Sequence, residues 1–156
     1  MVRDVAVLVG FLVLCFAVAG IGSWFTSMGM PEWYEALNKP SWNPPSWVFG
    51  PVWTALYFAM GLAAWLVWRE AGFGGATTAL TLFFVQLALN LAWSGIFFAL
   101  QRPGWALVEL TALWIAILAT TILFFRHSNW AGALMVPYLL WVTFAGTLNA
   151  AIVRLN

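Results

Sequence analysis

Apolar residues fill most of the chain in long runs, and short polar segments separate one run from the next. Because a helix rises about 1.5 Å per residue, about 20 apolar residues span the roughly 30 Å hydrocarbon core of a bilayer. The runs that reach this length cover approximately residues 5–25, 47–68, 76–100, 105–125 and 130–153. The pattern therefore predicts an all-α integral membrane protein, a bundle of five transmembrane helices.

The connections between the runs indicate how the helices are arranged. The later connections are short, "REAGFGG", "QRPG" and "RHSN", so consecutive helices are expected to be antiparallel neighbours. The first connection, residues 28–46, is long and rich in proline and tryptophan. Arg3 precedes the first run as in a signal peptide, but the run is too long, and we expect a retained helix. No linker or repeat divides the chain, and residues 1–156 are expected to form one domain.

Composition and charge exclude several classes of protein. Hydrophobic residues make up 64% and charged residues 7% of the chain, whereas soluble domains hold about 25% charged residues. A net charge of +1 argues against nucleic-acid binding, which depends on many basic contacts to phosphates. Cys15 is the only cysteine, so no intrachain disulfide can form. Lysine and arginine divide evenly between the two sides, so the positive-inside rule favours neither orientation.

The third apolar run has two unlike faces. Gln86, Asn90 and Ser94 recur every fourth residue with Trp93 beside them, and they share one face of a helix. This polar face predicts either hydrogen bonds between helices or the wall of a pocket. Small residues occupy the opposite face: Ala88, Ala92, Gly95 and Ala99. They predict close packing, either in a homodimer or against a neighbouring helix of the same chain.

Three tryptophans lie too deep in the predicted helices for the interfacial belt, namely Trp53, Trp93 and Trp141. Deep indoles either fill a core or line a pocket for a flat, largely apolar ligand. Asn90 and Ala145 lie at similar depth, which favours the pocket. Prolines at positions 40, 44 and 45 restrict the long loop, which we interpret as a lid over this pocket.

Four segments of the chain resemble, in order, the signatures of the TspO/MBR family: "WYEALNKPSWNPP", "GPVWTALYF", "LNLAWS" and "VPYLLWVTFAGTLN". These are the translocator proteins, or peripheral-type benzodiazepine receptors, and the resemblance covers essentially the whole chain. It implies a homodimeric five-helix bundle that binds porphyrins such as protoporphyrin IX and haem, and in some members cholesterol or benzodiazepine-site ligands. It also implies tetrapyrrole transport, stress-linked regulation or light-dependent porphyrin breakdown, in the cell membrane of a bacterium.

The resemblance assigns residues to these roles. Trp53 and Trp141 match a pair implicated in porphyrin binding and degradation in bacterial members. The positions that match ligand-binding residues are Tyr34, Trp53, Asn90, Trp93, Ser94, Trp141, Ala145 and Leu148. The C-terminal sterol motif is broken, because "TLNAAIVRLN" has Ala150 where the motif needs tyrosine. This departure argues against sterol binding through that motif.

Three classes of function remain. A binding, transport or sensing protein needs only the pocket, the lid and an entry path. The chain has one histidine, His127, and no paired carboxylates within a run, so no acid–base or metal site is predicted. Photochemistry at Trp53 and Trp141 is the enzymatic alternative; the bound porphyrin would make the reactive species, and no separate cofactor is required. A retinal protein is disfavoured, because the only lysine, Lys39, lies in the loop. An ion-coupled transporter is disfavoured, because no run has a carboxylate near its centre.

Overall fold

The computed structural model describes residues 1–156 and contains helices but no strand. The five long helices are α1 (Val2–Gly29), α2 (Phe49–Gly75), α3 (Thr77–Ser94), α4 (Pro103–His127) and α5 (Asn129–Leu155). Shorter turns extend three of them: the π-helices Met30–Tyr34 and Gly95–Ala99, and the 3-10 helix Ser46–Val48. All five segments are long and apolar enough to cross a membrane, which confirms the predicted fold class.

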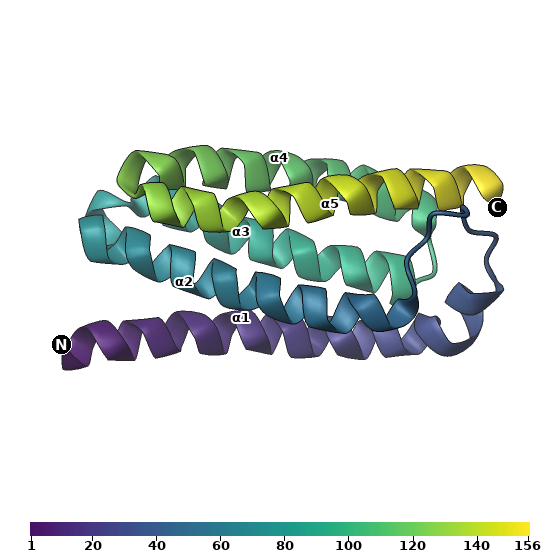
Figure 1. Cartoon of the computed structure of the whole chain (residues 1–156), viewed down its shortest axis with the longest axis horizontal. Coiled ribbons are helices and arrows are strands. Elements are labelled where there is room, and N and C mark those ends of the chain that lie inside the picture. Colours follow the sequence, from purple (N-terminus) through teal and green to yellow (C-terminus); the bar gives the residue numbers. More distant parts are fainter.

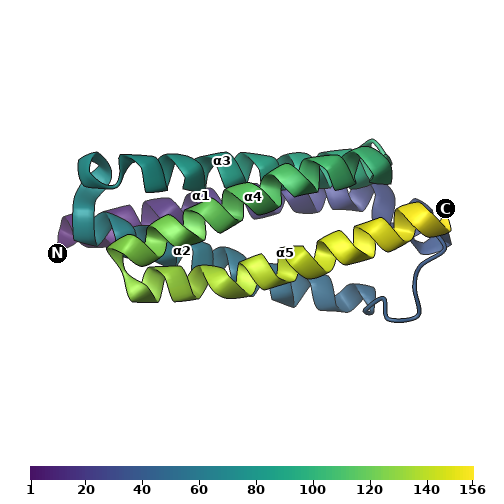
Figure 2. The ribbon, with the colours of Figure 1, turned by 90° about the horizontal axis from the view of Figure 1, so that it is seen from above.

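The helices form a closed ring (Figures 1 and 2). Around it, α1 packs against α2, α2 against α5, α5 against α4, α4 against α3, and α3 with its π turn against α1. The long loop, the connection between α3 and α4, and the C-terminus share one end of the bundle, which we call the loop end. The N-terminus lies at the opposite end.

Two clusters of buried side chains fill the ring. The larger cluster extends to the end opposite the loop and includes Met60, Phe83, Phe124 and Tyr138, all with 0% of their surface exposed. The rings of Phe83 and Phe124 stack with centroids 5.8 Å apart and hold α3 against α4. A smaller cluster lies under the loop and contains Tyr34, Phe97, Phe98, Ala106, Leu148 and Ile152. Trp93 packs against both clusters.

The long loop begins later than the sequence predicted. Residues 28–36 are helical, because a π turn at Met30–Tyr34 accommodates Pro31, which has no N–H to donate. The Lys39 ammonium then caps the helix end, with Nζ 2.8 Å, 3.3 Å and 3.2 Å from the carbonyl oxygens of Tyr34, Glu35 and Leu37. The Tyr34 carbonyl also accepts the backbone N–H of Leu37 over 3.1 Å, whereas the carbonyls of Glu35 and Leu37 would otherwise lack partners. The irregular loop is therefore limited to residues 37–45.

Hydrogen bonds fix this shorter loop in place. Tyr34 Oη donates to Asn43 Oδ1 over 3.0 Å. The backbone N–H of Asn38 donates to Asn156 Oδ1 over 3.1 Å, and Asn156 Nδ2 donates back to the Asn38 carbonyl over 2.9 Å. The paired asparagines tie the loop to the end of α5, on the far side of the ring from α1 (Figure 1). The loop thus lies across the loop end of the bundle.

Gly29 marks a close approach between α1 and the π turn after α3. A Cβ at this position would lie 2.6 Å from the Phe98 carbonyl oxygen, which is backbone and has little freedom to move. We expect Gly29→Ala to lower the free energy of unfolding by about 1–2 kcal/mol through overpacking. Gly20→Ala, at a position of α1 where nothing lies within 4 Å, is the matched control and should not destabilise. Unfolding of the purified protein in detergent, titrated with sodium dodecyl sulfate, measures both; equal stabilities would contradict the packing.

Candidate functional site

A cavity of about 330 Å³ lies inside the loop end of the bundle. Side chains from α1, α2, α3, α5 and the two π turns form its wall. All the residues that the sequence predicted as ligand-binding lie on this wall: Tyr34, Trp53, Asn90, Trp93, Ser94, Trp141, Ala145 and Leu148. The structure thus brings them together, and their contact with a ligand stays a prediction.

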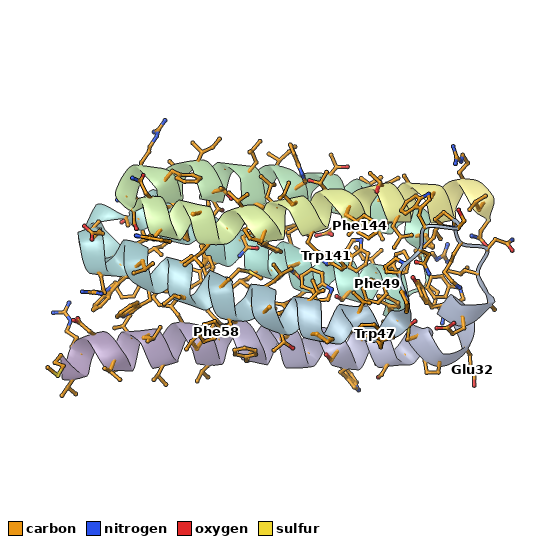
Figure 3. The ribbon with its side chains drawn as sticks, viewed as in Figure 1. Glu32, Trp47, Phe49, Phe58, Trp141 and Phe144 are labelled. Atoms are coloured by element: carbon orange, nitrogen blue, oxygen red, sulfur yellow. The ribbon has the colours of Figure 1, made fainter.

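The indoles of Trp53 and Trp141 meet edge to face between α2 and α5. Their ring centroids are 6.4 Å apart and their planes are 89° apart. Phe49 and Phe144 surround Trp141, with centroids at 6.0 Å and 5.5 Å, and Figure 3 shows the three rings together near the loop end. Neither the Trp53 nor the Trp141 N–H donates to a protein group, and neither nitrogen is a buried atom. Both N–H groups are therefore free to donate to a ligand.

A chain of buried hydrogen bonds joins the cavity wall to the core. Tyr57 Oη donates to Asn90 Oδ1 over 3.0 Å, and Asn90 Nδ2 donates to Tyr138 Oη over 2.7 Å. Tyr138 Oη then donates to Gln86 Oε1 over 2.6 Å. The polar face of α3 has both predicted roles. Asn90 and Ser94 line the cavity, and Gln86 forms a hydrogen bond to Tyr138 on α5.

The contribution of α1 to the cavity wall was not predicted from the sequence. Gly22, Ser23 and Thr26 line the cavity, and a Cβ on Gly22 would lie 3.6 Å from the hydroxyl oxygen of Ser94. The sequence does contain a signal for this contribution, because the segment "GIGSWFT" places small and hydroxyl residues within an otherwise apolar run. Tyr138 was also missed, although it lies one turn before Trp141 and therefore on the same face of α5.

The exposed residues of the cavity wall indicate where the cavity opens. Most wall residues are buried or half-buried, but Ser23 on α1 and Gly50 and Thr54 on α2 are exposed on the outer surface of the bundle. Ser46, where the loop meets α2, is exposed too. The mouth therefore lies between α1 and α2, close to the loop.

The small residues of α3 and of the π turn that follows it do not form one uniform surface. Ala88 and Ala92 are exposed on the outside of the bundle. Gly95 instead faces its own chain, because a Cβ there would lie 3.6 Å from the Phe25 ring. Ala99 is half-buried. The outward pair remains available to a second copy, and the homodimer stays a prediction.

Comparison with known proteins identifies the family. The family model described as TspO/MBR matches residues 11–155. The "Tryptophan-rich protein TspO" of Archaeoglobus fulgidus is 41% identical over 149 residues, which cover 96% of each chain. The "Translocator protein" of Homo sapiens is 47% identical over 116 residues, 73% of this chain and 69% of the relative. The "Tryptophan-rich sensory protein" of Cereibacter sphaeroides is 45% identical over 114 residues, 73% of this chain and 70% of the relative.

These matches agree with the architecture. The family match begins within α1 and ends at the last residue of α5, so it takes in the cavity and the loop. With five helices able to cross a membrane, the chain is an integral, multi-pass membrane protein. It belongs to the TspO/MBR family.

Proposed function

We propose that the cavity binds porphyrins or related tetrapyrroles, and that the protein transports or senses them. The observation that carries this proposal is the wall itself, where the rings of Trp53, Trp93 and Trp141 surround one space under a fixed loop. Flat macrocycles offer large apolar faces, which aromatic side chains contact well. Asn90 and Ser94 add a small number of uncharged polar groups that can orient such a ligand.

The names of the relatives support the same class of function. One is called a translocator protein and another a sensory protein, and both cover about seven-tenths of this chain. Transport and sensing each require reversible binding of a ligand, and a cavity with a mouth between α1 and α2 permits it. A bacterial cell membrane as the location stays a proposal, since the relatives come from organisms as different as Archaeoglobus fulgidus and Homo sapiens.

Titration of the purified protein with protoporphyrin IX tests the binding proposal. Bound porphyrin should quench the fluorescence of the cavity tryptophans and saturate at one molecule per chain. Cholesterol, added in the same assay, probes the sterol alternative that the altered C-terminal motif disfavours. Quenching that rises without saturation would contradict a defined site.

Light-dependent porphyrin breakdown is a second candidate, and the position of the two adjacent indoles of Trp53 and Trp141 on the cavity wall favours it. An excited porphyrin would generate the reactive species, and Trp53 and Trp141 would react with it at contact distance. We expect the Trp53→Phe, Trp141→Phe double variant to slow the loss of porphyrin absorbance under illumination. The matched control is Trp47→Phe, Trp130→Phe, at positions that are 74% and 77% exposed. Equal loss in both variants, or loss in the dark, would contradict the enzymatic candidate.

We also propose that two chains associate through the outward face of α3. Small side chains at Ala88 and Ala92 let two helices approach closely, and packing of this kind drives association in lipid. In a Cys15→Ala background, a cysteine at Ala88 or Ala92 should therefore cross-link two chains in membranes. The control is a cysteine at Ala112, an exposed position of α4. Efficient cross-linking at Ala112 alone would place the interface on another helix.

A further inference from the structure

The resemblance to the family implies that the protein binds haem as well as metal-free porphyrin. These two ligands differ in the protein groups that they require. The iron of haem is held in proteins by an axial ligand, usually histidine nitrogen, cysteine or methionine sulfur, or tyrosine oxygen. None of the residues on the cavity wall is histidine or cysteine. His127 lies at the opposite end of the bundle, and Cys15 is fully buried in the core.

The remaining candidate ligands on the wall are two tyrosines and one methionine. Tyr34 and Tyr57 donate their hydroxyl protons to Asn43 and Asn90, so both phenols are neutral and engaged. Met30 offers a thioether at the π turn near the loop. Methionine ligates haem mainly in partnership with a histidine on the other face of the ring, and the wall has none. The donor set therefore does not fit haem.

The cavity also lacks a partner for the two carboxylates of a protoporphyrin. No lysine or arginine lies on the wall. The Lys39 ammonium is close by, but three backbone carbonyl oxygens lie within 3.3 Å of it. An unpaired carboxylate inside a low-dielectric space is strongly unfavourable. The carboxylates must then remain at the mouth, near the exposed Ser46 and Gly50, while the ring enters.

We propose that the cavity is selective for metal-free planar tetrapyrroles, which it holds by the faces of the ring, and that it does not coordinate the iron of haem. This inference rests on the proposed porphyrin-binding function. Ferric haem carries a charged iron with its own water or anion, and entry would strip these away without replacing them. A metal-free ring has neutral faces, and it has no bound water or anion to lose when it enters the cavity.

Three probes test the selectivity on the full-length protein in phosphatidylcholine nanodiscs: protoporphyrin IX, its dimethyl ester and ferric haem. We expect the acid and the ester to bind within about threefold of each other, because the carboxylates stay outside. Haem should bind at least about tenfold more weakly, a difference of about 1.4 kcal/mol, and its absorption spectrum should not become that of a six-coordinate low-spin iron.

Several outcomes would overturn the inference while leaving porphyrin binding intact. An ester that binds tenfold more weakly than the acid would show that the protein holds the carboxylates. Haem that binds as tightly as protoporphyrin with a low-spin spectrum would show an axial ligand, and loss of that spectrum in Met30→Leu would identify it as Met30. If none of the three probes binds, the proposed function itself fails, and the inference fails with it.

Discussion

Replacing Ala145 by phenylalanine is expected to weaken protoporphyrin binding at least about a hundredfold, or about 2.8 kcal/mol. Ala145 lies on the cavity wall one turn after Trp141 on α5, so a larger side chain there would extend toward the indoles. The added ring would fill part of a cavity of about 330 Å³ and exclude a macrocycle. Because the ring occupies existing space, the fold should lose little stability. Fluorescence titration measures the affinity, and detergent unfolding measures the stability.

Exposed alanines of the same helix supply the controls for this prediction. Ala133 and Ala150 face outward on α5, and phenylalanine at either position should leave porphyrin affinity unchanged. Equal affinities for the wild type and Ala145→Phe would show that porphyrin binds elsewhere. A loss of affinity in all three variants would instead indicate a general disturbance of α5.

The fold could be predicted because the lipid bilayer around the protein restricts it to helices. Backbone groups in lipid must be satisfied within the segment, so a long apolar run has few alternatives to a helix. The predicted starts and ends were less accurate where a specific side chain decides them. Lys39 lies three residues beyond the last helical residue, and its bonds to the carbonyls of Tyr34 and Leu37 depend on the folded position of the loop. Residues 28–36 were therefore assigned to the loop in error.

The cavity wall could be predicted in part, for a different reason. Asn90 and Ser94 recur every fourth residue in an apolar helix, and this spacing can be read from one segment alone. The contribution of α1 depends on which helices are neighbours in the ring, and that arrangement is not encoded in any single run. The hydrogen bond between Gln86 and Tyr138 also depends on which helices are neighbours, since 52 residues separate the two side chains in the sequence. Periodicity identifies the polar face of a helix, and only the packed structure shows which residues that face contacts.

Tyr138 connects the cavity wall to the core, and removing its hydroxyl is expected to destabilise the protein strongly. Its oxygen accepts a hydrogen bond from Asn90 over 2.7 Å and donates one to Gln86 over 2.6 Å. Tyr138 and Gln86 have none of their surface exposed, and Asn90 only 3%. In Tyr138→Phe, one buried amide donor and one buried amide acceptor lose their partner. At 1 kcal/mol or more for each group, we expect a loss of about 2–3 kcal/mol in the free energy of unfolding.

A double-variant cycle separates this effect from simple loss of contacts. Removing both partners of a buried hydrogen bond leaves neither an unsatisfied donor nor an unsatisfied acceptor from that bond, and such replacements can be nearly neutral in stability. Gln86→Leu combined with Tyr138→Phe should therefore destabilise by less than the sum of the two single changes. Tyr57→Phe breaks only the bond to Asn90 Oδ1 and should have a smaller effect than Tyr138→Phe. Strict additivity in sodium dodecyl sulfate unfolding would show that the side chains of Gln86 and Tyr138 do not interact.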